Sequence, residues 1–160
     1  MSEITYRPIG VIRTPFKVVK GTPIQPTGAV GVRGSVHVEA QYGEGLKDIE
    51  GFSHIILLYH FHLARGYSLQ VQPYMDKERR GMFATRIPGR PNPIGLSIVR
   101  LVGVDGCTLQ VEDVDIIDGT PLLDIKPYVP DFDMRETHRI GWLAGRSSNV
   151  QHAKSDGRLK

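Results

Sequence analysis

The stretch Thr85–Ser97 (TRIPGRPNPIGLS) has the composition of a rigid ligand-binding loop. Its three prolines and two glycines disfavour regular secondary structure and favour a stiff, irregular backbone. Arg86, Arg90 and Asn92 lie within it, and the forked donors of arginine suit phosphate or carboxylate groups. We therefore predict that this loop holds a ligand; the alternative is a structural turn whose arginines are only solvated.

Four acids crowd a second stretch, Asp113–Pro130 (DVDIIDGTPLLDIKPYVP), beside one lysine and one tyrosine. The residues concerned are Asp113, Asp115, Asp118, Asp124, Lys126 and Tyr128. Carboxylates near a lysine can bind a cationic ligand or perturb a pKa, and they are natural partners of ribose hydroxyls. Asp118, Lys126 and Tyr128 are our candidates for acid–base or orienting roles, although Asp118-Gly119 also fits a plain turn with exposed acids around it.

Three histidines, His54, His60 and His62 (HIILLYHFH), could carry a different chemistry. All fall on even positions, so a regular strand would place them on one face. Neutral imidazoles two residues apart can ligate zinc, but no carboxylate follows His62 at short range. A packed or ligand-contacting histidine is favoured, and we predict no metal site; a metal-dependent β-barrel enzyme remains as an alternative.

The elements that must position these residues are predicted to be short strands, because glycine and proline recur too often for long helices. One short helix is expected at Ala40–Lys47. The pair Asp105-Gly106 between two apolar runs is typical of a type I′ hairpin turn. The expected strands span Tyr6–Thr14, Ser35–Glu39, His54–His62, Ile98–Val104, Thr108–Val114 and Leu122–Lys126.

Many short strands separated by turn signals predict a mostly-β barrel or sandwich with few short helices. The glycines Gly28, Gly31 and Gly34 form GxxGxxG with no helical pattern after them, so a Rossmann fold is not expected. We expect one domain over residues 1–146 and a polar, disordered tail over residues 147–160.

Composition favours a cytoplasmic protein, and the distribution of charge fits either nucleic-acid binding or a solvated basic face. The single cysteine, Cys107, is predicted to be an inert thiol, and the N-terminus lacks an apolar signal region. The longest apolar run, Ile55–Tyr59, is too short to cross a membrane. Lys77–Arg100 holds six Lys/Arg against one acid, a density to which a phosphate backbone responds; a solvated face is the alternative.

Four long motifs resemble the TrmO/TsaA-like methyltransferase family, and the resemblance covers about Tyr6–Asp131. The matching stretches are IGVIRTPF (Ile9–Phe16), YGEGLKDIEGFSHIILLYHFH (Tyr42–His62), FATRIPGRPNPIGLS (Phe83–Ser97) and DGTPLLDIKPYVP (Asp118–Pro130). The resemblance implies a single-sheeted β-barrel that forms homodimers and binds S-adenosylmethionine. It further implies methylation of N6 of threonylcarbamoyl-adenosine, just 3′ of the anticodon in tRNA.

The resemblance also implies where the cofactor binds, in and beside the stretches described above. The residues implied are Pro26, Thr27, Gly28, His62, Leu63, Arg86, Leu96, Glu112, Asp113, Val114 and Asp115.

Binding of tRNA is predicted on the basic stretch that adjoins Arg86. We expect Lys77, Arg79, Arg80 and Arg90 to hold anticodon-stem phosphates, while Asn92 lies nearer the target base. A non-catalytic barrel that binds S-adenosylmethionine and associates with RNA is the competing interpretation, and a methyl-transfer assay separates the two.

Overall fold

Six antiparallel strands close into a single barrel in the computed structural model, which describes residues 1–20, 28–74 and 76–146. Around the barrel the strands follow the order β1-β2-β7-β6-β3-β8. Their bounds are β1 Gly10–Arg13, β2 Arg33–Val38, β3 His54–His60, β6 Ile94–Asp105, β7 Thr108–Glu112 and β8 Thr120–Pro127. The mostly-β, single-sheeted barrel predicted from the sequence is confirmed. Within the described residues, no helix is long and apolar enough to span a membrane.

Period-two alternation builds the barrel wall, because successive side chains of a strand point to opposite faces. In β6, Ser97 and Val99 point inward and are buried, whereas Leu96 and Ile98 lie outside. The inward side chains of all six strands meet in one core, which the segment after β7 completes. Its buried members are Ile12, Val36, Val38, Ile55, Leu57, Tyr59, Val99, Leu109, Val111, Val114, Ile116 and Leu122.

Two predicted strand starts were wrong by four residues, whereas the other strand ends agree within two residues, and both larger differences reflect pairing between strands. The first strand is only Gly10–Arg13, since pairing with β2 and β8 begins at Gly10. Strand β6 begins at Ile94 rather than Ile98, because residues Ile94–Ser97 pair with β3. The last residues of the predicted rigid loop are therefore part of the barrel wall.

Two local predictions also need correction. The expected helix at Ala40–Lys47 is a 3-10 helix, η2 (Ala40–Leu46), and a second one, η3 (Ile49–Gly51), follows. The β6–β7 turn is made by Gly106 and Cys107, not by Asp105-Gly106, and only Gly106 has positive φ (59°). A type I′ turn needs positive φ at both central residues, whereas positive φ at the first alone is the pattern of type II′.

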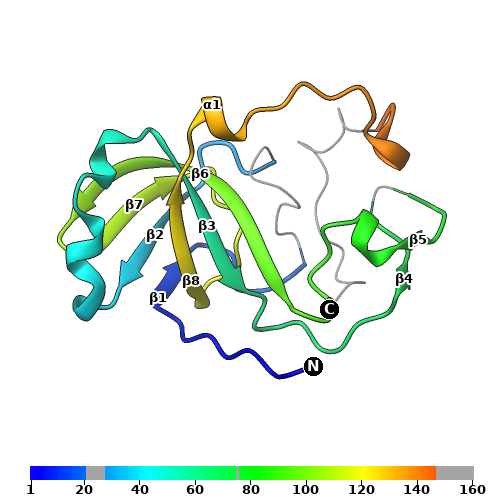
Figure 1. Cartoon of the computed structure of the whole chain (residues 1–160), viewed down its shortest axis with the longest axis horizontal. Coiled ribbons are helices and arrows are strands. Elements are labelled where there is room, and N and C mark those ends of the chain that lie inside the picture. The colour runs from blue at the N-terminus through cyan, green and yellow to red at the C-terminus, as the bar shows by residue number, and fades with distance from the viewer. Residues whose placement is uncertain (21–27, 75, 147–160) are drawn as a thin grey trace.

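A small lobe lies beside the barrel, to the right in Figure 1. It contains β4 (Gln70–Val71), β5 (Arg80–Gly81) and the 3-10 helix η4 (Met82–Ala84). Val71, Met82 and Ile87 form its own small core. After β8 the chain forms α1 (Pro130–Asp133), crosses the top of the view and reaches η5 (Gly141–Leu143) beside this lobe. The tail predicted over residues 147–160 lies outside the described residues.

Candidate active site

One end of the barrel gathers most of the residues that sequence motifs single out. We call it the mouth: the end at which β1, β3 and β7 finish and β2, β6 and β8 begin. Because neighbouring strands are antiparallel, the ends of alternate strands and the starts of the others lie at the same rim. Three motifs converge there: the glycine loop before β2, the Arg86 loop before β6, and the acidic segment between β7 and β8.

The segment after β7 places the carboxyl group of Asp115 at the mouth. Val114 and Ile116 are buried in the barrel core, and Asp115 lies between them in sequence. Ser97 Oγ donates a hydrogen bond to Asp115 Oδ1 at 2.6 Å, and Tyr59 OH lies 2.9 Å from Ser97 Oγ. Burial raises the pKa of Asp115 to about 7, although the Ser97 hydrogen bond and the Arg86 charge act in the opposite direction. Asp115 is thus a carboxyl group that can gain or lose a proton near neutral pH.

The glycine loop is joined to the acidic segment by Asp113. Its carboxylate Oδ1 accepts the Gly31 amide at 2.7 Å, and Val114 N donates to Val32 O at 3.3 Å. Asp113 itself has φ of 66°, a left-handed conformation that only a few residue types adopt readily. Asp113 therefore holds the end of the loop that includes Gly28 against the residues predicted to bind cofactor.

Arg86 brings a positive charge to the mouth from the lobe side. The residue is exposed, and its charge lowers the pKa values of both Asp115 and Tyr59 against the larger, raising effect of burial. His62 follows β3 at the same rim, and burial, then the nearby His60, lowers its pKa. The mouth therefore combines a guanidinium, a titratable carboxyl and a neutral imidazole, all provided by residues implied to bind cofactor.

The side chains of two predicted cofactor residues do not point into the mouth. Glu112 is paired across three strands with Arg33, at 3.1 Å, and with Arg100, and the Arg100 hydrogen bond lowers its pKa most. The Leu96 side chain lies on the outside of the barrel, opposite Leu58 of β3. Pro26 and Thr27 lie outside the described residues.

The three catalytic candidates are separated by the length of β8. Asp118 is at the mouth, where its carboxylate accepts the Thr14 amide at 3.0 Å and pairs with Lys17 at 2.7 Å. The Lys17 hydrogen bond, then the Thr14 amide, lowers its pKa. Lys126 lies near the other end of β8, paired with Asp124 at 2.9 Å, and Tyr128 follows it. At ~3.3 Å per residue, the six residues from Thr120 to Lys126 span roughly 20 Å, so Lys126 and Asp118 cannot act on one atom within a protomer.

The three histidines are also spread out. His54 and His60 begin and end β3, so roughly 20 Å of strand separates them. His54 instead packs against the Tyr128 ring, with 6.4 Å between ring centroids. Among the residues that the structure describes, no three His, Cys, Asp or Glu side chains gather as a metal site.

The residues predicted to bind tRNA differ in how far their side chains are engaged by the lobe. Arg79 is exposed and donates one hydrogen bond to Gln70 O at 3.0 Å, and Asn92 is exposed at the base of β6. Arg80 pairs with Asp76 at 2.6 Å, and Arg90 donates to Thr85 O at 2.9 Å and to Ile87 O at 3.2 Å. The guanidinium groups of Arg80 and Arg90 therefore brace the lobe itself.

Sequence reasoning missed the two side chains that support Asp115. Ser97 closes the proline-rich motif and Tyr59 lies within the apolar run of β3, but neither has a local pattern that pairs it with Asp115. Their contacts join residues 18 and 38 positions apart. The sequence signal that could have found them is that both occupy inward positions near the same end of two paired strands, β3 and β6.

Comparison with known proteins gives consistent matches over most of the chain. The family model of the tRNA-methyltransferase O N-terminal domain matches residues 11–134. A probable S-adenosyl-L-methionine-binding protein of Pyrococcus abyssi is 59% identical over 156 residues, covering 98% of this chain and 85% of that protein. The tRNA (adenine(37)-N6)-methyltransferase of Escherichia coli is 39% identical over 140 residues, covering 81% of this chain and 60% of that enzyme. The crystal structure of TrmO from Pseudomonas aeruginosa has a TM-score of 0.74 at 38% identity, covering 88% of this chain and 63% of that one. The chain thus spans less than two thirds of the two methyltransferases.

Proposed function

Because this chain belongs to the tRNA-methyltransferase O family, we propose that it transfers a methyl group from S-adenosylmethionine to N6 of adenosine 37 in tRNA. The substrate that we propose is the threonylcarbamoyl form of this adenosine. The single observation that carries the proposal is the convergence of Arg86, Asp115 and the Gly28 loop at one barrel mouth. The proposed reaction places the protein in the cytoplasm, with its tRNA substrates.

The chemical groups at the mouth fit S-adenosylmethionine. The ligand carries a carboxylate, an ammonium group, a ribose diol and a sulfonium cation. Arg86, an exposed arginine, suits the carboxylate, and the Asp115 carboxyl suits the ribose diol. Gly28 and His62 can contribute backbone and ring contacts at the same rim, beside the main chain of Glu112–Val114.

When bound, S-adenosylmethionine supplies a methyl group that its positive sulfur has already activated. The protein's main tasks are therefore to orient the acceptor nitrogen and to receive its proton. Asp115, with a pKa of about 7, can hold that proton near neutral pH. Asp118 also lies at the mouth, but Lys17 and the Thr14 amide hold its carboxylate in the ionised form. Among the original candidates, Asp118 therefore fits an orienting role better than a proton-accepting one.

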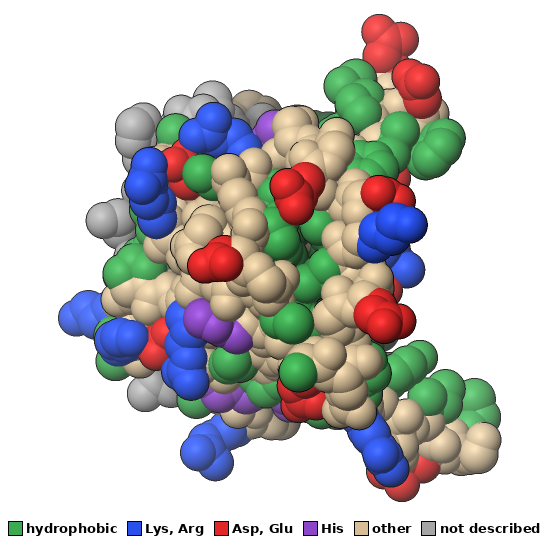
Figure 2. Space-filling model, turned by 90° about the vertical axis from the view of Figure 1, so that its left-hand side faces the viewer, with side chains coloured by type: hydrophobic (Ala, Val, Ile, Leu, Met, Phe, Trp, Pro, Cys, Tyr) green, Lys and Arg blue, Asp and Glu red, His purple; other side chains and the backbone are tan. Residues whose placement is uncertain are grey.

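Transfer RNA phosphates are proposed to meet the lobe. Lys77 and Arg79 are exposed there, and Asn92 lies between the lobe and the mouth, whereas Arg80 and Arg90 shape the surface from beneath. The side of the molecule away from the lobe suits RNA less, because acidic side chains are spread over its centre and its Lys and Arg side chains lie toward the margins, most of them on the left (Figure 2).

A methyl-transfer assay across salt concentrations tests both parts of the proposal. We expect transfer to tRNA that carries threonylcarbamoyl-adenosine and not to tRNA that lacks it. Arg79→Glu should weaken all accepted tRNAs alike and flatten the salt dependence, because phosphate contacts do not read sequence. Lys47→Glu, an exposed lysine just after η2, is the matched control and should behave as wild type. Cofactor binding without transfer to any tRNA would favour the non-catalytic alternative.

We also propose a homodimer that buries the outer face of β6. Ile94, Leu96, Ile98 and Val102 point outward along this strand and are 44%, 48%, 36% and 50% exposed, and Arg100 between them is paired with Glu112. A closed barrel has no free strand edge to cover, so this apolar stripe is the part of the wall that a second copy would shield. Lys126 and Tyr128 lie at the far end of β8 from the mouth of their own protomer, so a second copy could bring them to a mouth.

Sedimentation at micromolar concentration tests the assembly. We expect a dimer for the wild type and a shift to monomer for Val102→Glu, because a charge would be buried in the apolar contact. Val30→Glu, an exposed valine in the loop before β2, should leave the dimer intact. A wild-type monomer with full methyl-transfer activity would contradict the proposal.

A further inference from the structure

The chain continues past the matched family domain and returns to the lobe. The family match ends at residue 134, and the next twelve residues cross from α1 to the lobe (orange in Figure 1). We call residues 135–146 the strap. Its single tryptophan, Trp142, lies in η5, and Arg146 is the last residue that the structure describes.

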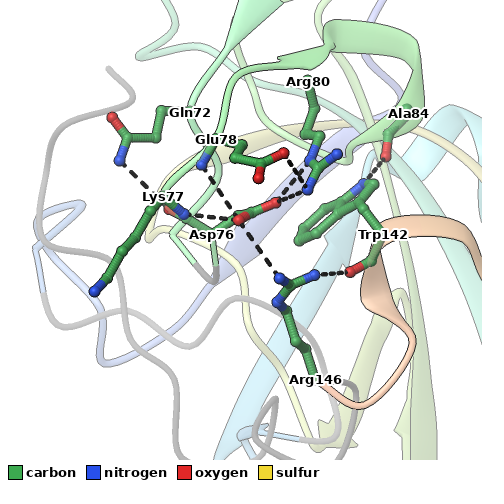
Figure 3. A network of polar contacts seen from close by, with 8 residues as sticks. All are labelled: Gln72, Asp76, Lys77, Glu78, Arg80, Ala84, Trp142 and Arg146. Carbon is green, nitrogen blue, oxygen red and sulfur yellow. Dashed lines mark hydrogen bonds and ion pairs between the residues drawn. The ribbon is translucent and has the colours of Figure 1, made fainter.

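Two strap side chains hold the lobe (Figure 3). Trp142 Nε1 donates a hydrogen bond to Ala84 O at 2.8 Å, and Arg80 Cζ lies 6.0 Å from the Trp142 ring centroid, within range of a cation–π contact. The Arg146 guanidinium pairs with Asp76 at 3.8 Å and also donates to Trp142 O. The contacts between strap and lobe join residues at least 58 positions apart in the sequence.

Asp76 is the junction of this network. Its side chain is 4% exposed, and its carboxylate accepts the Lys77 amide at 2.7 Å, the Glu78 amide at 3.2 Å and Arg80 Nε at 2.6 Å. Burial alone would raise its pKa, but the Arg80 hydrogen bond and the two amides lower it. An ionised, largely buried carboxylate with this many donors fixes the groups around it, and Arg146 of the strap is one of them.

The contact with Ala84 lies two residues before Arg86. Ala84 ends η4, and Thr85 Oγ1 then donates to Met82 O at 2.7 Å, which fixes the turn out of that helix. Arg90 braces the far side of the same loop through Thr85 O and Ile87 O. Arg86 therefore lies in a loop whose backbone is fixed on both sides of it. Its charge acts on Asp115 at the mouth.

We propose that the strap is a positioning element, in which Trp142 and Arg146 hold η4 and its following loop so that the Arg86 charge acts on Asp115. The strap touches neither the proposed cofactor residues of the mouth nor the barrel strands in any of the contacts described above. It acts through Ala84 and Asp76. The expected effect of the strap on S-adenosylmethionine affinity rests on the proposed function, whereas its expected effect on the titration of Asp115 does not.

The test is the titration of the Asp115 carboxyl group by carbon-13 NMR in the ligand-free protein. Ser97 of β6 is hydrogen-bonded to Asp115, Tyr59 of β3 is hydrogen-bonded to Ser97, and the Arg86 charge acts on Asp115 from the lobe side. Because the Arg86 charge favours the ionised form, Trp142→Ala should raise the pKa of Asp115 above its wild-type value, in the direction that Arg86→Ala raises it. Amide exchange should quicken in η4 and remain slow in β3.

Two further variants keep the test decisive if Trp142→Ala folds poorly. Trp142→Phe keeps a ring over Arg80 but removes the indole donor to Ala84, and Arg146→Ala removes the ion pair with Asp76; each should raise the pKa of Asp115 by a smaller amount. Arg139→Ala, an exposed arginine of the same strap, is the matched control and should change nothing. An unchanged Asp115 titration in folded Trp142→Phe and Arg146→Ala proteins would overturn the proposal.

Cofactor affinity, measured by calorimetry, is the second readout. Trp142→Phe should weaken S-adenosylmethionine binding by about 2- to 30-fold, the range for residues that act on a site without touching its ligand. If the Asp115 titration shifts while the wild-type protein binds no S-adenosylmethionine, the strap positions Arg86 and the proposed function is wrong. If binding is tight but Trp142→Phe changes neither readout, the proposed function stands and the positioning role fails.

Discussion

Replacing Arg86 with alanine is expected to weaken S-adenosylmethionine binding by about 10- to 150-fold, the equivalent of about 1.5–3 kcal/mol for a hydrogen bond to a charged group. Arg86 is an exposed residue at the mouth, and its charge acts on Asp115. The ligand carboxylate would lose the cation that best matches its two oxygens. Calorimetric titration of the purified variant measures the change.

The controls separate charge from shape. Arg86→Lys keeps the charge without the planar fork and should fall between wild type and alanine. Arg65→Ala removes another exposed arginine that precedes the lobe strands and should bind as wild type. The same Arg86→Ala protein should show a higher pKa for Asp115, because the charge that favours the carboxylate is gone. Wild-type affinity in Arg86→Ala would remove this residue from the site.

Substituting Gly95 with alanine is expected to destabilise the protein by about 1–3 kcal/mol, as overpacking of a core does. A Cβ at Gly95 would lie 2.2 Å from Cε2 of the Tyr59 ring, and that ring is buried in the barrel. The ring cannot swing into solvent as the end of a flexible side chain would. Its hydroxyl would therefore shift away from Ser97, and the support of Asp115 would weaken. Urea denaturation measures the loss of stability.

Strand β6 provides a matched control for this substitution. Gly103 lies in the same strand, and a Cβ there would meet no atom within 4 Å, so Gly103→Ala should change stability by no more than about 0.5 kcal/mol. Tyr59→Leu should relieve the clash, so the Gly95→Ala and Tyr59→Leu changes should be strongly non-additive. Equal stabilities for Gly95→Ala and Gly103→Ala would show that the mouth tolerates a larger residue than the structure implies.

Local patterns in the sequence predicted most of the barrel wall. Polar and apolar residues alternate in β2 and β7, and the apolar ones, such as Leu109 and Val111, are those that point inward, because the two-residue period of a strand is visible within five or six residues. The proline-rich motif likewise marked the Arg86 loop, since proline and glycine restrict the backbone wherever they occur. The long motifs were enough to identify the family.

Partners across the fold could not be predicted in the same way. Nothing near Ser97 or Tyr59 in the sequence indicates that they support Asp115, because the closure of the barrel brings these residues together. Period-two alternation assigned the three histidines to one face but not to one place, and the length of β3 separates His54 from His60. The alternation of side chains shows which face of a strand a residue occupies, whereas the distance between two residues on that face grows with their separation along the strand.

The sequence by itself determined the strand-rich character of the chain, the rigid loop that carries Arg86 and the family to which the chain belongs. Only the tertiary structure decided which charged groups are available to a ligand. Arg79 and Arg80 are neighbours with the same side chain, yet Arg79 is exposed and Arg80 is engaged by Asp76 and Trp142. The physical reason is that a charged side chain interacts most strongly with the groups within a few ångströms of it. For Arg80 one of these groups is Trp142, about sixty residues further along the chain.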